Sequence, residues 1–230
     1  MKKGEKKEAL NSNIPLTKND FRKSLPWKIF KIMAEFIEGF ELISELDKRS
    51  ATFFGATRLS ENNPEYEKAQ KLSRLLSEKG YTIISGGGPG IMEAANRGAV
   101  EAKGESVGIN IELPDGQRTN KYVKKAVGFH YFFTRKVMMS LASSVYVFFP
   151  GGYGTLDEFF EMVMLLQTKK LSHPVTIVVV GKDYWQPLFN WFETELYQKR
   201  RAISKEDLSL FTLVDTAEEA VEFIIKNDKK

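Results

Sequence analysis

The stretch from Pro150 to Glu158 (PGGYGTLDE) combines a glycine-rich turn with a carboxylate. An apolar run typical of a buried strand, 145–149, precedes it, and a segment of helical character, 159–166, follows it. A glycine-rich turn between a strand and a helix N-terminus leaves backbone N–H groups free to bind phosphate or another anion without a basic side chain. Glu158 adds a carboxylate beside that anion. The combination predicts a site that processes a nucleotide.

The same residues also fit a structural role. The sequence from Thr155 to Glu158 matches a capping box, in which the glutamate bonds back to the backbone at the start of the helix. Acidic residues in a first helical turn also interact favourably with the helix dipole. Taken alone, Glu158 fits the structural role as well as the catalytic one. The preceding glycines favour chemistry, because a simple helix cap does not explain them.

Two further glycine-bearing loops follow predicted strands, at 55–58 (GATR) and 85–90 (SGGGPG). The second does not fit the G-x-G-x-x-G spacing, because Ile91 stands where the last glycine is required. No Gly-Lys-Ser/Thr follows it, as a Walker A loop needs. These departures argue against NAD binding and ATP hydrolysis and leave phosphate binding of a mononucleotide open. The alternative is a tight turn that lets a helix pack closely on a strand.

A third segment, 129–136 (FHYFFTRK), contains an arginine and several aromatic residues. The fork of donors on Arg135 could hold a substrate phosphate or ribose, or it could pair with a surface carboxylate. Phe132 and Phe133 could stack on a purine, but the pattern favours a place in the core. His130 is interpreted as a hydrogen-bonded structural residue.

Short apolar runs alternate with helical patterns from Ala51 onward, which is typical of a parallel sheet covered on both faces. The predicted fold is α/β: a single domain with a Rossmann-like, doubly wound parallel sheet and an extra N-terminal helix. Ligands of such sheets bind at the carboxyl ends of strands. The predicted strands are 51–55, 81–85, 106–111, 145–149, 175–180 and 210–214. The predicted helices are 64–79, 91–103, 133–143, 155–168, 184–197 and 216–226.

The N-terminal part of the chain differs in character from the rest. Residues 1–23 are polar and basic and predict a disordered arm. Residues 24–48 predict an amphipathic helix whose apolar face packs on the core or on a second subunit. Its acidic opposite face, formed by Glu35, Glu38 and Glu45, argues against binding to an anionic lipid surface. Residues 49–230 form the expected Rossmann-like domain.

Composition narrows the classes of function. The chain has 230 residues, of which 42% are hydrophobic, enough for one domain with a sizeable core. The absence of cysteine removes disulfides and thiolate chemistry, and the presence of only 2 histidines argues against a His-rich metal site. A net charge of +4 with no RNA-binding or helix-turn-helix pattern predicts no nucleic-acid partner. No apolar run suggests a membrane span or a signal peptide, so a cytoplasmic location is expected.

The segments 85–93 (SGGGPGIME) and 150–158, with Arg135-Lys136 between them, together resemble the LOG (Lonely Guy) family, relatives of which were earlier described as possible lysine decarboxylases. The resemblance covers roughly residues 50–227. It implies a homodimer that hydrolyses the N-glycosidic bond of AMP derivatives to the free base and ribose 5-phosphate, without a metal or an organic cofactor. It also implies that Arg135 and Glu158 are the catalytic pair. The expected substrate- and phosphate-binding residues are Gly86, Gly87, Gly88, Lys136, Gly151, Gly152, Gly154 and Thr155.

Two departures from the family pattern leave the substrate open. Gly116 stands where relatives often carry a glutamate, and Met164 stands where they often carry a threonine. AMP and a prenylated adenine nucleotide therefore both remain candidate substrates. The main alternative is a non-catalytic nucleotide or molybdenum-cofactor carrier with the same glycine loops. Lysine decarboxylation ranks last, because Lys136 is the only lysine within the motifs and nothing marks it as a pyridoxal-binding residue.

Overall fold

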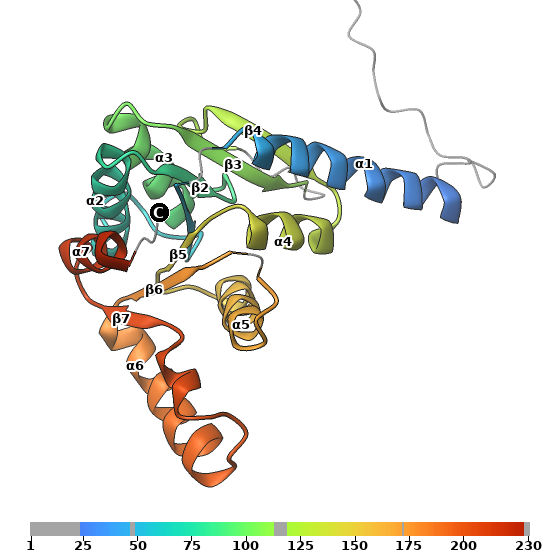
Figure 1. Cartoon of the computed structure of the whole chain (residues 1–230). Coiled ribbons are helices and arrows are strands. Elements are labelled where there is room, and N and C mark those ends of the chain that lie inside the picture. The colour runs from blue at the N-terminus through green and yellow to red at the C-terminus, as the bar shows by residue number, and fades with distance from the viewer. Residues whose placement is uncertain (1–23, 47–48, 113–118, 172, 228–230) are drawn as a thin grey trace, which may run out of the picture.

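The computed structural model describes residues 24–46, 49–112, 119–171 and 173–227 (Figure 1). The predicted arm 1–23 and the position of Gly116 lie outside the described residues.

A seven-stranded parallel sheet forms the centre of the molecule, in the order β4-β3-β2-β1-β5-β6-β7. The predicted α/β fold is therefore confirmed. Strand order reverses between β1 and β5, so the loops after these two strands diverge and leave room for a ligand. The strands are β1 (Ser50–Phe54), β2 (Thr82–Ser85), β3 (Ser106–Ile111), β4 (Lys125–Phe129), β5 (Val145–Phe148), β6 (Thr176–Val180) and β7 (Thr212–Val214).

Helices cover both faces of this sheet (Figure 1). The inner strands are apolar on both sides, and each face has its own buried core. One core lies under α2, α3 and α7, and the other under α1, α4, α5 and α6. The α-helices are α1 (Leu25–Ser44), α2 (Pro64–Glu78), α3 (Ile91–Glu101), α4 (Phe132–Leu141), α5 (Tyr153–Gln167), α6 (Lys182–Trp191) and α7 (Ala217–Asn227).

Several boundaries differ from the predicted ones. Strand β4 was missed because it is an edge strand with largely exposed side chains, which carries no apolar run. The helix predicted at 184–197 begins at Lys182 and continues after Trp191 as a π-helix, η2 (Phe192–Lys199). A short 3₁₀ helix, η3 (Glu206–Ser209), precedes β7.

Helix α1 begins where the sequence predicted, since the Ser24 hydroxyl accepts a hydrogen bond from the Trp27 N–H and a proline lies in the first turn. Its N-terminal half extends past the sheet (Figure 1). Phe36 and Ile43 pack against the core, but many of its other apolar side chains are exposed. Glu35, expected on the outer acidic face, is instead buried. None of the described helices is both long enough and apolar enough to cross a bilayer.

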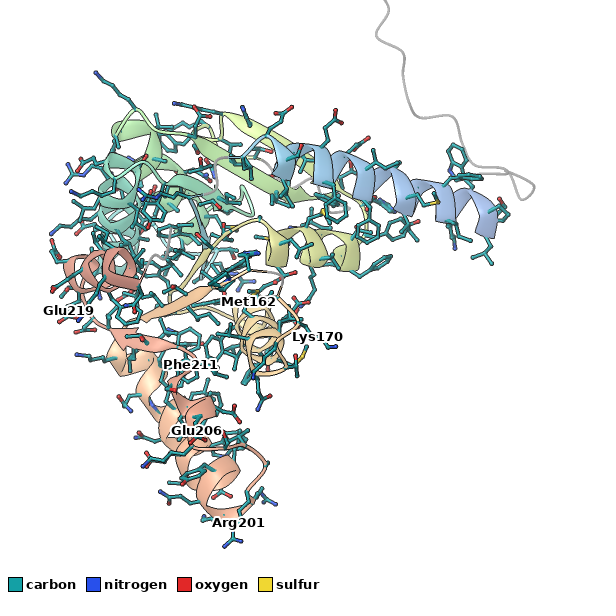
Figure 2. The ribbon with its side chains drawn as sticks, viewed as in Figure 1. Met162, Lys170, Arg201, Glu206, Phe211 and Glu219 are labelled. Carbon is teal, nitrogen blue, oxygen red and sulfur yellow. The ribbon has the colours of Figure 1, made fainter. Side chains whose placement is uncertain are left out.

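An aromatic cluster anchors α5 to the C-terminal part of the chain. The ring of Phe159 lies 5.1 Å from that of Trp185 and 5.3 Å from that of Phe211. Figure 2 labels Phe211 beside β7 and α6. Phe159 and Trp185 are fully buried, so this packing fixes the rotation of α5 about its axis. The residue before Phe159 is Glu158.

The backbone of Ala56 joins the loops at the carboxyl ends of three strands by hydrogen bonds. The Ala56 N–H, after β1, donates to the Pro150 carbonyl after β5 at 2.9 Å. The Ala56 carbonyl accepts from the Ile91 N–H, at the start of α3 after β2, at 3.0 Å. Gly90 has a φ of +70°, and a Cβ at this position would overlap the Ala56 carbonyl oxygen. The second loop therefore needs glycine at 90 for close packing.

Candidate active site

A pocket of about 330 Å³ opens at the point where the strand order reverses. Loops after β1, β2 and β5 line it, together with the end of β3 and the first turn of α4. Its lining residues are Phe54, Gly55, Ala56, Thr57, Gly86, Met92, Ile111, Phe132, Arg135, Gly152, Gly154, Thr155, Asp157 and Glu158. The structure thus brings together the three loop regions and the arginine that the sequence singled out.

The N-terminus of α5 faces this pocket. Gly152 is the N-cap and, as a glycine, has no side chain that could cap the helix. The first helical hydrogen bond runs from the Leu156 N–H to the Gly152 carbonyl at 3.1 Å. The N–H groups of Tyr153, Gly154 and Thr155 therefore have no acceptor within the helix. These donors, at the positive end of the helix dipole, suit a bound phosphate.

The predicted capping box is wrong. The helix begins at Tyr153 rather than Thr155, so Thr155 lies within the first turn and Glu158 in the second. A carboxylate that far along the helix is out of place to cap the first N–H groups. The structural role that competed with catalysis for Glu158 is thereby removed.

Glu158 is buried, with only 8% of the residue exposed. Burial raises the pKa of this carboxyl from 4.5 to about 7, and the charges of Glu161 and Asp157 act in the same direction. Lys136 and Arg135 partly oppose the rise in pKa. A carboxyl with a pKa near neutrality can both accept and release a proton at physiological pH, as a general acid–base group must.

Arg135 lies in the first turn of α4 and is also largely buried. Its Nε–H donates to the Ile109 carbonyl at the end of β3, at 2.8 Å. Burial lowers its pKa and the nearby charge of Glu158 raises it. Gly86 makes room for the guanidinium, since a Cβ there would overlap Arg135 Nη2. Among the described residues Arg135 forms no ion pair within 4.0 Å, so its charge is available to a ligand.

Other predicted binding residues have structural partners. Gly87 has a φ of +71°, and its N–H donates to the Ser85 hydroxyl at 2.9 Å. The side-chain amide of Asn120 donates to the Gly88 carbonyl at 2.9 Å, and its N–H donates to the Gly87 carbonyl at 2.8 Å. Gly87 and Gly88 do not line the pocket, so the tight-turn interpretation fits them and the binding interpretation fits Gly86.

Lys136 and Gly151, two further predicted binding residues, have partners of their own. Lys136 Nζ pairs with Asp157 at 2.6 Å and with Glu161 at 3.2 Å. Burial lowers the pKa of Lys136, but these carboxylates and Glu158 together raise it. The Gly151 carbonyl accepts the Tyr184 hydroxyl at 2.6 Å. Neither residue is among those that line the pocket.

Sequence reasoning missed part of the pocket. Phe132 lines it and is 58% exposed, and the neighbouring Phe133 is 50% exposed, so the expectation that both belong to the core is wrong. Both residues lie in the first turn of α4, which begins at Phe132. Asp157 and Met92 also line the pocket. Both lie within the motif segments 85–93 and 150–158, and that position was the signal that could have found them. The described residues contain no group of three or more His, Asp or Glu side chains that could hold a metal ion.

Comparison with known proteins places this geometry in a family. The profile of the family described as "Possible lysine decarboxylase" matches residues 92–224, more than half of the chain. The chain belongs to this family. It is the LOG family that the motifs indicated, since the curated relatives that match are named as cytokinin riboside 5′-monophosphate phosphoribohydrolases.

Three curated relatives show how far this likeness extends. A probable enzyme of that name from Oryza sativa subsp. japonica is 27% identical over 56% of this chain and 53% of its own length. The Arabidopsis thaliana enzyme is 27% identical over 63% of this chain and 64% of its own length. The Rhodococcoides fascians enzyme is 23% identical over 63% and 74%, respectively. The chain therefore spans between half and two thirds of the length of the two plant relatives.

Solved structures share the fold. The molybdenum cofactor binding protein of Rippkaea orientalis gives a TM-score of 0.60 at 20% identity, covering 79% of this chain and 98% of that one. The molybdenum cofactor carrier protein of Chlamydomonas reinhardtii gives a TM-score of 0.57 at 20% identity, covering 78% of this chain and 98% of that one. At this identity the likeness is one of fold.

The raised pKa of Glu158 predicts a cost in stability that depends on pH. Between pH 4.5 and about 7 the folded protein retains a proton that the unfolded chain releases, so ionising Glu158 weakens folding progressively as pH rises. The full cost, about 3 kcal/mol, applies above pH 7. We expect Glu158→Gln to unfold at a higher temperature than wild type at pH 8, with a difference that shrinks toward pH 4.5. Differential scanning calorimetry across this range would show it, and a difference independent of pH would contradict the assignment.

Proposed function

We propose that this protein hydrolyses the N-glycosidic bond of an adenosine 5′-monophosphate derivative, releasing the free base and ribose 5-phosphate. The observation that carries the proposal is a buried carboxyl, Glu158, whose pKa is about 7, within two turns of a helix N-terminus that can hold phosphate. The family and the names of its curated relatives support the choice of reaction.

In the proposed reaction the phosphate of the nucleotide binds the free N–H groups of Tyr153, Gly154 and Thr155, which holds the ribose against Glu158. The bond between C1′ and the base nitrogen breaks, its electron pair leaves with the base, and positive charge develops on the ribose ring. The Glu158 carboxylate stabilises this charge and takes a proton from the attacking water, whose oxygen bonds to C1′. The base nitrogen gains a proton, so nucleotide and water alone balance the reaction.

Arg135 supplies a positive charge in this pocket, opposite in sign to Glu158 and to the substrate phosphate. Its Nε is bound to the Ile109 carbonyl, which leaves the other guanidinium donors for the ribose or the phosphate. Burial strengthens any such contact, because charges interact more strongly away from water. Lys136 acts indirectly in this scheme, since it balances the carboxylates around Glu158.

The proposed base site lies on the apolar wall of the pocket. Side chains of Phe54, Met92, Ile111 and Phe132 provide apolar surface there. An aromatic ring at the pocket mouth can stack on a purine. This wall is compatible with adenine and with an adenine that carries an apolar N6 substituent.

Lysine decarboxylation, which the family description suggests, finds little support. A Schiff-base lysine must lose its proton readily, and such lysines have lowered pKa values. Lys136 has a raised pKa because three carboxylates surround it. The residues present therefore do not fit a pyridoxal-binding lysine at this position.

We expect Glu158→Gln to bind AMP with nearly unchanged affinity and to lower the rate of base release by about 10²–10⁴-fold, the usual range for a general base. The measurement is release of free base and ribose 5-phosphate from AMP and from isopentenyladenosine 5′-monophosphate, alongside calorimetric binding. Glu161→Gln, one turn further along α5, is the matched control and should keep turnover.

The ratio of rates on the two nucleotides identifies the preferred base. Full turnover by folded Glu158→Gln would contradict the mechanism. Wild-type protein that binds nucleotide and cleaves neither substrate would favour a nucleotide or molybdenum-cofactor carrier.

The pH profile should report Glu158 directly. Because burial raises its pKa to about 7, kcat/KM should rise with pH through this value as the carboxylate forms. Lys136→Met removes a charge that lowers the pKa, so the acid limb should move to higher pH. Glu161→Gln removes a charge that raises the pKa, so the limb should move to lower pH. A limb that both variants leave in place would belong to the substrate phosphate and contradict the assignment.

We also propose a homodimer, as the family resemblance implies. Exposed large apolar side chains on α1, α4 and α5 support it, namely Leu25, Trp27, Ile29, Phe30, Met33, Ile37, Phe40, Phe132, Phe133, Phe160 and Met164. Exposed apolar patches of this kind mark association sites. Light scattering should give the mass of two chains, and Ile37→Glu should give a single chain. A wild-type monomer at micromolar concentration would contradict the proposal.

A further inference from the structure

Glu35 is a buried carboxylate in the middle of α1, with 6% of the residue exposed. Its neighbours along the helix, Ala34 and Ile37, are exposed, as is Glu38 one turn away. Buried carboxylates are rare in proteins unless they are paired or hydrogen-bonded. This one belongs to a helix that precedes the matched family segment 92–224 altogether.

In the part of the chain that the structure describes, the hydrogen-bond donors to Glu35 come from residues 130–134, at and just before the start of α4. The His130 N–H donates to Oε1 at 2.9 Å, and the Tyr131 N–H donates to Oε2 at 3.3 Å. The Thr134 hydroxyl lies 2.6 Å from Oε2. These donors are about a hundred residues away in sequence.

Glu35 therefore supports the start of α4 from outside this segment, as a cap on the N–H groups of its N-cap, Tyr131, and of the preceding His130. Tyr131 is the N-cap and contributes no side-chain capping bond. A carboxylate at a helix N-terminus satisfies free N–H groups and complements the positive end of the helix dipole. Four residues after Glu35, Gly39 packs against Met138 and Phe129, where a Cβ would overlap Met138. The two contacts together hold α1 on α4.

The first turn of α4 carries residues of the pocket. Arg135 follows Thr134 directly, and Phe132 lies two residues before Thr134. The direction of the Arg135 side chain depends on the placement of this turn relative to β3, because its Nε is bound to the Ile109 carbonyl. Whatever holds the turn in place also holds the guanidinium.

We propose that Glu35 is a positioning residue for Arg135. The N-terminal helix α1 then contributes to the geometry of the site. This inference rests on the proposed function. The hydrogen-bond partners of Glu35 among the described residues, His130, Tyr131 and Thr134, do not line the pocket. Glu35 acts by fixing the backbone of residues 130–134, which sets where the Arg135 guanidinium lies.

The test is a double-mutant cycle between Glu35→Ala and Arg135→Lys, with base release and nucleotide affinity measured for each protein. We expect Glu35→Ala to lower kcat/KM by about 10-fold in the wild-type background and by less than about 2-fold beside Arg135→Lys, because residues that act through one another are not additive. Glu35→Gln keeps an acceptor oxygen for the His130 N–H and should recover most of the activity.

Two controls separate positioning from general weakening of the fold. Glu38→Gln removes an exposed carboxylate of the same helix and should leave activity unchanged. Gly39→Val disturbs the contact of α1 with Met138 without touching the cap. Gly39→Val should lower the melting temperature. When the two variants are compared at an equal loss of stability, Gly39→Val should lose less kcat/KM than Glu35→Ala.

Additive losses in the cycle, or equal loss of activity in Gly39→Val at matched stability, would overturn the proposal. If wild-type protein releases no base, the proposed function fails. The double-mutant cycle is then evaluated from the AMP affinities of the four proteins alone. Non-additive affinities would still support positioning of Arg135, and additive ones would overturn it.

Discussion

The site depends on the backbone of one residue, Ala56, which holds three loops together where the strand order reverses. Its N–H binds the loop after β5, and its carbonyl binds the start of α3 after β2. A reversal of strand order leaves diverging loops, and these two hydrogen bonds set how far they diverge. Gly90 allows the close approach, because any side chain there would strike the Ala56 carbonyl. The pocket and the free N-terminus of α5 both follow from this arrangement.

Within that frame, the structure places a carboxyl where its charge is costly. Phe159 and its aromatic neighbours hold α5 so that Glu158 is buried against the pocket. Burial raises the pKa of Glu158, and the nearby cations Lys136 and Arg135 limit the rise. A protein under selection for stability alone would have no reason to keep this group. Perturbed carboxyls in a cleft are typical of sites that use them.

The N-terminal helix has two different faces. Its inner face carries Glu35 and Gly39, which meet the first turn and the middle of α4. Its outer face exposes apolar residues that suit a second subunit. The segment precedes the part of the chain that matches the family profile, and yet it contacts the helix that carries Arg135. In the two proposals, α4 therefore contributes both to the pocket and to the association surface.

The sequence by itself determined the class of the sheet, the positions of its inner strands along the chain and the loops of the site, because long apolar runs and glycine spacing are local signals. The order of the strands came from the structure. The sequence could not place β4, whose edge strand lacks such a run. It also misjudged Glu35, Phe132 and the start of α5. Those depend on contacts between residues far apart in the chain: the burial of Glu35 requires α4, and the pKa of Glu158 requires the whole pocket. Only the tertiary structure could decide them, since burial and electrostatic environment arise when distant segments pack together.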